Sequence, residues 1–148
     1  MKKMNKKGFT LIEMLVVIAI IAVLVSIIIP VVGNSTDKAA AATNAANLRS
    51  CKAEITTAYL TNDTGRWTFG AIATGSTTGT VTTAEGNLPT FKDMAKAPSA
   101  PTGYTFKGTY NANGGFSATY DANGNIIVTY DGLRIDDWAA LANTTPGK

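Results

Sequence analysis

Apolar residues are concentrated in one long run near the start of the chain. Residues 14–32 read MLVVIAIIAVLVSIIIPVV, interrupted only by Ser26 and Pro30, and no charged residue lies between Glu13 and Asp37. This stretch of 19 residues would cover about 28 Å as a helix, because each residue adds about 1.5 Å. That length is close to the thickness of the hydrocarbon core of a bilayer. The run therefore predicts a single transmembrane helix.

Residues 35–60 remain helix-prone, but their apolar residues lie on one side only. The stripe consists of Leu48, Cys51, Ile55 and Ala58. Because these positions recur at helical spacing, we expect the stripe to pack against the rest of the chain, with Cys51 as a small buried side chain. Ser35, Thr36 or Asp37 could cap a new helix. Without such a break, one helix covers residues 9–60.

Residues 61–102 are rich in Gly, Thr and Pro and predict a long loop. Trp67 and Phe69 are the large apolar residues near its start, and we expect them to anchor the loop on the core. A short helix is predicted for 88–95, where Pro89 stands near the beginning.

Beyond residue 102 the apolar residues alternate with polar ones, which is typical of strands. The predicted strands are 104–107, 116–120 and 126–130. The turns between them are 111–115 and 121–125, two five-residue links that contain Asn-Gly, so the strands are expected to form an antiparallel meander.

Further residues are expected to extend and close this core. They are Leu133 and Ile135 as another edge strand, Trp138 and Leu141 as core side chains, and Asp136 or Asp137 as a helix cap. The sheet then covers residues 103–135, and 136–148 form a C-terminal segment. The fold class is α+β: a long N-terminal helix packed on a small antiparallel sheet.

Charge and composition exclude several classes of protein. The chain has 13 Lys and Arg against 10 Asp and Glu, but removing residues 1–8 leaves 9 against 10. General nucleic-acid binding therefore loses its main support. The absence of His excludes a Ser-His-Asp triad and a His-ligated zinc site, and a single Cys excludes an intrachain disulfide. We predict a protein that is not an enzyme and has no cofactor.

A calcium site is the metal alternative that the sequence allows. Residues 121–125 faintly resemble the start of a calcium-binding loop, and further carboxylates follow. An EF-hand needs Glu at loop position 12, where this chain has Gly132. Turn formation explains the segment without a metal, so we predict no metal site.

Glu13 is the residue that a plain membrane anchor does not explain. It stands at the edge of the apolar run, after Phe9, Leu11 and Ile12. A charged side chain costs about 2.5–3.5 kcal/mol at the centre of a membrane and less near its surface. Glu13 therefore either reaches the headgroups or pairs with a partner, and the second reading makes it functional.

Residues 6–13, Lys-Lys-Gly-Phe-Thr-Leu-Ile-Glu, followed at once by the apolar run, resemble the class III signal of type IV pilins and their relatives. The resemblance covers roughly the first thirty residues. It implies that a membrane peptidase cuts between Gly8 and Phe9 and methylates the new N-terminus of Phe9. Glu13 would then be the fifth residue of the mature chain, which is the assembly glutamate of that family.

Pro30 and Gly33 weaken the predicted helix at one place, because proline removes a helical hydrogen bond and glycine is a poor helix former. A kink follows from the residues, and the resemblance adds local unwinding during filament assembly. The predicted parts are a cleaved leader at 1–8, a transmembrane and assembly helix at 9–33, and a globular domain at 34–148.

The resemblance implies a structural subunit of a type IV pilus, and the presence of Glu13 and the modest size of the chain favour a major subunit. It would polymerise into a helical filament for adhesion, twitching motility or biofilm formation. The implied partners are further copies, a prepilin peptidase, an assembly ATPase and a platform protein; DNA is allowed but not indicated. Lysines before the apolar run place the N-terminus in the cytoplasm until assembly moves the subunit to the cell surface.

Three alternatives remain open. The first is a major pseudopilin of type II secretion, and the second is a pilin for DNA uptake. The third is a membrane-tethered binding protein that never assembles. Many pilins also close their C-terminal region with a disulfide, which this chain cannot form, so packing around Trp138 is expected to hold that region.

Overall fold

The structure is a computed structural model that describes residues 9–63, 65–83, 88–94 and 97–144. Its elements are α1 (Leu11–Thr61), β1 (Trp67–Phe69), β2 (Thr78–Thr83), β3 (Phe116–Asp121), β4 (Ile126–Tyr130), β5 (Leu133–Arg134) and α2 (Ile135–Ala142). The chain divides into two compact units, Met1–Ser35 and Thr36–Lys148. The predicted α+β fold is confirmed.

Helix α1 begins two residues later and ends one residue later than the predicted helix 9–60. It is continuous, so the new helix start considered at Ser35, Thr36 or Asp37 is wrong. The helix ends at the predicted turn, where Asn62 has a positive φ of 53° and the Asp63 N–H donates to the Ala58 carbonyl at 3.0 Å. A left-handed residue followed by such a backward hydrogen bond is a common helix terminus.

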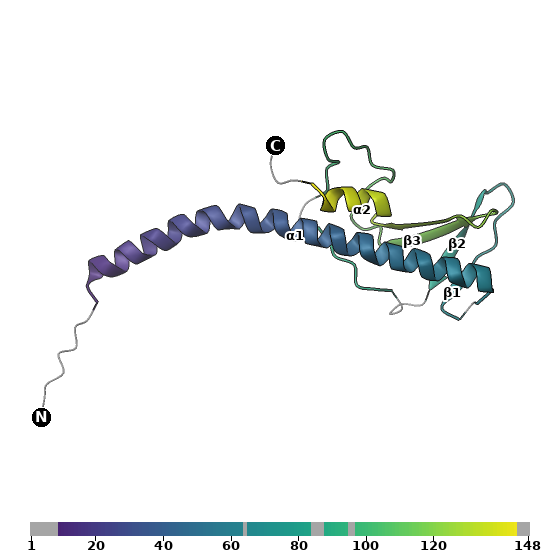
Figure 1. Cartoon of the computed structure of the whole chain (residues 1–148), viewed down its shortest axis with the longest axis horizontal. Helices are drawn as coiled ribbons and strands as arrows, with labels where there is room; N and C mark the ends of the chain where they lie inside the picture. Colours follow the sequence, from purple (N-terminus) through teal and green to yellow (C-terminus); the bar gives the residue numbers. More distant parts are fainter. Residues whose placement is uncertain (1–8, 64, 84–87, 95–96, 145–148) are drawn as a thin grey trace, which may run out of the picture. The chain divides into compact units, whose positions relative to one another are not determined.

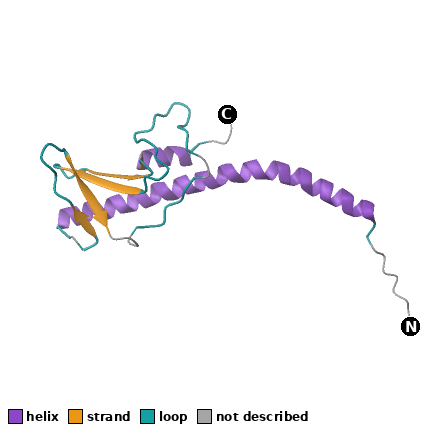
Figure 2. Cartoon of the chain, turned by 180° about the vertical axis from the view of Figure 1, so that it is seen from behind, coloured by secondary structure: helices purple, strands orange, loops and turns teal. Residues whose placement is uncertain are grey.

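The five strands form one antiparallel sheet in the order β1-β2-β3-β4-β5. Figures 1 and 2 show this sheet against the part of α1 that belongs to the second unit. Strands β4 and β5 are joined by Asp131 and Gly132, which both have positive φ, at 48° and 76°. Two such residues form the tight turn whose twist matches that of a hairpin.

The core lies between α1, the sheet and α2. The predicted stripe is buried, with Leu48 and Ile55 at 0% exposure and Cys51 at 1%. Trp138 is also fully buried, and its indole N–H donates to the Tyr130 carbonyl at 3.2 Å. The side chains that complete this core are Ala41, Ala45, Ala58, Trp67, Val81, Ala118, Ile126, Val128, Leu133 and Leu141.

The predicted loop 61–102 is wrong as a single loop, because it contains β1 and β2. Trp67 and Phe69 do anchor it, but as residues of a strand that pairs with β2. Strand β2 has Val81 as its one strongly apolar residue among threonines and a glycine. Threonine suits a strand because it is β-branched, although it adds little to an apolar pattern.

The predicted helix at 88–95 is not observed in its described part, 88–94, which runs as an extended strap along α1. The buried Asn44 side chain donates to the Lys92 carbonyl at 2.7 Å and accepts from the Lys92 N–H at 2.8 Å. Asn47 donates to the Thr90 carbonyl at 2.9 Å. These side-chain hydrogen bonds use backbone groups that a helix would have paired within itself.

The predicted strand 104–107 is also wrong, so the sheet does not begin at residue 103 but at Trp67. The backbone N–H groups of Lys107 and Gly108 donate to the carboxylate of Asp137 at 2.8 and 3.0 Å. Because these groups turn toward α2, they are not paired with a neighbouring strand.

Candidate assembly site at the start of the helix

The first turn of α1 is closed by Thr10 and Glu13. One carboxylate oxygen of Glu13, Oε2, accepts from the Thr10 backbone N–H at 2.7 Å and from the Thr10 hydroxyl at 2.8 Å. In return the Glu13 N–H donates to the Thr10 hydroxyl oxygen at 3.3 Å. This reciprocal arrangement is a capping box, which satisfies backbone donors that the helix itself leaves unpaired.

Thr10 is the functional residue that the sequence analysis missed. Its signal was present, because Thr followed three residues later by Glu, just before an apolar run, is the pattern of a capping box. The cap fixes the conformation of the Glu13 side chain at the helix N-terminus, where the helix dipole also favours a negative charge.

The second oxygen of Glu13, Oε1, has no hydrogen-bond partner among the described residues, since both bonds from Thr10 end on Oε2. An ionised carboxylate can accept about four hydrogen bonds. Glu13 can therefore keep its cap and still bind a cationic group brought from outside the chain.

The helix that follows is apolar on every side. Residues Leu11–Ile29 are long and apolar enough to cross a membrane, and none of them is buried. The Ser26 hydroxyl donates to the Val23 carbonyl at 2.7 Å, so this polar group is satisfied within the helix. A helix that is hydrophobic all round needs lipid or other helices to cover it.

The structure places the predicted site residues as follows. Phe9 lies just before α1 with 80% of its surface exposed, and Glu13 lies in the first turn. Gly8, the leader 1–8 and its lysines fall outside the described residues. The backbone of α1 continues through Pro30 and Gly33, and the predicted kink there remains a prediction.

In the second unit, the carboxylates are engaged within the fold. Asp121 accepts from Asn125 and Asn123, and these hydrogen bonds hold the pKa of its carboxyl below the usual range. Asp136 pairs with Lys107 at 2.6 Å. Among the described residues, no three side chains of the metal-ligating types come together.

Asp137 is the most heavily bonded of these carboxylates. It is fully buried and accepts from the Tyr104 hydroxyl and from the backbone N–H groups of Lys107, Gly108 and Arg134. The bond from the Arg134 N–H caps α2, so Asp137 is the capping carboxylate of the expected pair. It does so from the third position of the helix, because α2 already begins at Ile135, and the expected place of Ile135 in the edge strand is wrong. Together these bonds hold the loop around residues 104–108 against α2. A disulfide cannot serve this purpose, because the chain has a single Cys.

A family model for the prokaryotic N-terminal methylation motif matches residues 3–29. The chain carries this motif. It is a class III signal typical of type IV pilins and pseudopilins. Comparison with curated proteins and with solved structures finds no match.

The motif and the α+β, pilin-like fold together support a type IV pilin-like or pseudopilin-like subunit. Such a motif implies processing by a prepilin peptidase and assembly, and it indicates a structural and not an enzymatic role. The exposed apolar helix is consistent with a prepilin anchored in the membrane.

Proposed function

We propose that this protein is the major structural subunit of a type IV pilus. Copies polymerise through the N-terminal helix into a surface filament that serves adhesion, motility or biofilm formation. The observation that carries the proposal is the entirely exposed apolar helix Leu11–Ile29, which begins with a single capped carboxylate, Glu13. In the membrane this helix contacts lipid, and in the filament it contacts the helices of other copies.

Maturation supplies the partner of Glu13. Cleavage between Gly8 and Phe9 creates an α-amine with a pKa of about 7.7–8.0 in reference peptides. N-methylation of Phe9 leaves this nitrogen protonatable, so it remains a cation at neutral pH. The Phe9 amine of one copy then pairs with Glu13 of a neighbour through the oxygen that Thr10 leaves free.

The strength of this pair follows from its surroundings. Two unit charges 4 Å apart attract each other by about 4 kcal/mol at an effective dielectric of 20, before the cost of desolvation. Losing one partner leaves the other charge buried in apolar surroundings. The pair therefore fixes the register of neighbouring helices, while apolar burial supplies most of the binding free energy.

Other steps need partners and a flexible helix. The prepilin peptidase processes the chain in the cytoplasmic membrane, with the N-terminus on the cytoplasmic side, and an assembly ATPase and a platform protein extend the filament. Pro30 and Gly33 allow the helix to bend or unwind locally as subunits pack.

Replacing Glu13 tests the proposal. We expect Glu13→Ala and Glu13→Gln to leave cleavage and methylation intact and to abolish filaments, because both remove the negative charge. Mass spectrometry of the membrane fraction and electron microscopy of sheared fibres measure the two steps separately. Normal filaments from both variants would contradict the pairing.

A further inference from the structure

Four basic side chains gather on one flank of the second unit around one exposed carboxylate. Lys52, Arg134 and Asp136 line a depression of about 170 Å³ beside Ile127. Lys107 bonds Asp136 directly, and the nearby charges of Lys107, Arg49 and Lys52 lower the pKa of the Asp136 carboxyl. Among the described residues, Lys107 is the one cation of the four with an ion pair. We call Arg49, Lys52, Lys107 and Arg134 the basic surface.

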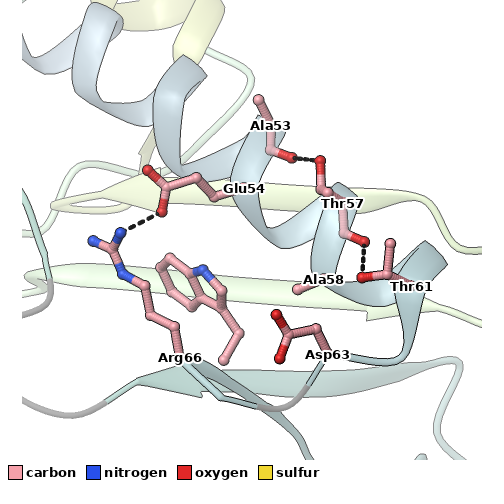
Figure 3. A pocket seen from close by; sticks show the side chains of 8 residues that line it. Ala53, Glu54, Thr57, Ala58, Thr61, Asp63 and Arg66 are labelled. Atoms are coloured by element: carbon pink, nitrogen blue, oxygen red, sulfur yellow. Dashed lines mark hydrogen bonds and ion pairs between the residues drawn. The ribbon is translucent and has the colours of Figure 1, made fainter.

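A groove of about 420 Å³ lies on another flank, between the last turns of α1 and the start of β1 (Figure 3). Its charged residues are Glu54, Asp63 and Arg66, and Glu54 pairs with Arg66 at 2.7 Å. Two carboxylates against one guanidinium give it a net negative charge. The hydroxyls of Thr57 and Thr61 on its wall donate their protons to helix carbonyls. Toward any other group, these hydroxyl oxygens can therefore act only as hydrogen-bond acceptors. We call this the acidic groove.

The two surfaces lie on opposite flanks of the same helix. Successive residues of an α-helix are rotated by about 100°. Relative to the buried Leu48, Arg49 and Lys52 are about 100° and 40° to one side, whereas Glu54 is about 120° to the other. The two surfaces also lie at opposite edges of the sheet. Strand β1 at one edge adjoins the acidic groove, and β5 at the other edge carries Arg134 of the basic surface.

We propose that the basic surface of one copy binds the acidic groove of the next copy. The inference rests on the proposed function and names the contact between globular units in the filament. Different patches on the two sides of one subunit make a heterologous contact, which continues without closing and builds a filament. A closed dimer would need one self-complementary patch instead.

Charge and spacing favour a second copy over a nucleic acid. Residues 36–148 contain nine basic and nine acidic residues, so the unit as a whole has no net positive charge to attract a nucleic acid. Exposed Ile127 beside the cations also suits a protein surface better than a phosphate backbone. Glu54 follows Arg49 by five residues and Asp63 follows Lys52 by eleven, so parallel copies displaced by about 8–16 Å bring the two surfaces together.

Matched charge reversals test the contact in cells that assemble the full chain. Lys52→Glu is expected to lower the filament yield at least tenfold, because it places like charges across the interface. Lys92→Glu makes the same change of charge at an exposed lysine outside both surfaces and is expected to leave the yield unchanged. Adding Asp63→Lys to Lys52→Glu restores opposite charges and is expected to recover filaments. Thermal unfolding of the detergent-solubilised full chain checks that each variant folds.

A disulfide test reports the contact directly. Lys52→Cys combined with Asp63→Cys cannot form a bond within one chain, because eleven residues separate the two positions by about 16 Å and a disulfide requires Cα atoms about 4.4–6.8 Å apart. Cys51 is buried and does not compete. We expect mild oxidation of filaments to give a ladder of linked copies from the double variant and none from either single variant.

The outcomes separate this proposal from the proposed function. The contact would be overturned if Lys52→Glu gave the native filament yield, or if Lys92→Glu lost as much yield as Lys52→Glu. It would also be overturned if filaments with both Lys52→Cys and Asp63→Cys gave no ladder of linked copies on oxidation. If the unmodified chain forms no filaments at all, the proposed function fails. The variant with both Lys52→Cys and Asp63→Cys is then oxidised in the membrane instead. Disulfide-linked copies there would support the contact, and their absence would contradict it.

Discussion

Thr10 holds the carboxylate of Glu13 by two hydrogen bonds to the same oxygen, at 2.7 and 2.8 Å, one from its backbone and one from its hydroxyl. The residue that is expected to bind a neighbouring subunit is therefore positioned before that subunit arrives. Preorganisation of this kind lowers the entropy lost when the contact forms. It also stabilises the first turn of α1.

Removing the Thr10 hydroxyl is expected to weaken assembly without blocking maturation. Loss of an N-cap costs about 1 kcal/mol, and the Glu13 side chain gains rotational freedom. Thr10→Val keeps the shape of the side chain but not its hydroxyl and should reduce filament yield, whereas Thr10→Ser should restore it. Filament mass per cell, normalised to mature subunit in the membrane, measures the effect; equal yields from all three chains would contradict a positioning role.

Asp137 is expected to be the most sensitive carboxylate of the second unit. In Asp137→Asn the new amide group cannot accept all four hydrogen bonds that the buried carboxylate accepts. We expect the free energy of unfolding to fall by about 3 kcal/mol, because a buried charged network is broken. Asp136→Asn is the matched control.

Asp136 is 61% exposed and makes a surface ion pair with Lys107. Its replacement should cost less than about 1 kcal/mol. Thermal unfolding of both variants, followed by circular dichroism in detergent, measures the difference. Equal losses from Asp136→Asn and Asp137→Asn would show that the buried hydrogen bonds do not hold the loop.

Replacing Asp131 by Asn is expected to maintain or raise the stability of the fold at neutral pH, whereas replacing Asp137 lowers it. It is 5% exposed, and burial raises the pKa of its carboxyl above the usual 3.8 although the Gly115 N–H donates to it. An acid with a raised pKa in the folded state stabilises the fold at low pH, and this contribution is lost as the pH rises from 3.8 through the raised value. Asn accepts the same hydrogen bond without charge and tolerates the positive φ of 48°.

Asp131→Asn should therefore be at least as stable as the native chain at pH 7, and the native chain should approach it as the pH falls. Unfolding temperatures measured from pH 4 to pH 7 test this. At each pH the unfolding temperature of the variant is compared with that of the native chain. If this comparison favoured the native chain more at pH 7 than at pH 4, the burial argument would be contradicted.

Asn44 is expected to control the strap of residues 88–94. Asn44→Ala leaves both the N–H and the carbonyl of Lys92 without their partners, so we expect a loss of about 2 kcal/mol. Asn47→Ala removes one bond at a less buried position and should cost about half as much. Limited proteolysis followed by mass spectrometry should show faster cutting at Lys92 in Asn44→Ala; unchanged cutting would mean that Phe91, stacked on Tyr130, holds the strap alone.

The sequence predicted the elements whose own residues carry a periodic signal. The stripe at Leu48, Cys51 and Ile55 is buried as expected, and the two strands rich in apolar residues, β3 and β4, appear where alternation placed them. Strand β2 was missed because threonine gives a strand little apolar contrast. The segments at 88–94 and 104–107 were misassigned because single side chains, Asn44 and Asp137, take their backbone hydrogen bonds from far along the chain.

The site shows a similar division. Glu13 was found because a charge at the edge of an apolar run is costly and needs a reason, and Phe9 followed from the resemblance of residues 6–13. The cap by Thr10 was missed, although Thr followed three residues later by Glu is a capping-box pattern, because the apolar run was interpreted first as a membrane segment. The basic surface could not be predicted, because Lys107 and Arg134 lie far along the chain from Arg49 and Lys52 and come beside them only in the folded unit.

The most direct test of the central claim is the intact mass and N-terminal sequence of this protein in fibres sheared from the cell surface. We expect an abundant chain that begins at N-methylated Phe9. A mature chain confined to the cell envelope would favour a pseudopilin of type II secretion over a surface pilus. A chain that keeps Met1 in every fraction would contradict the account.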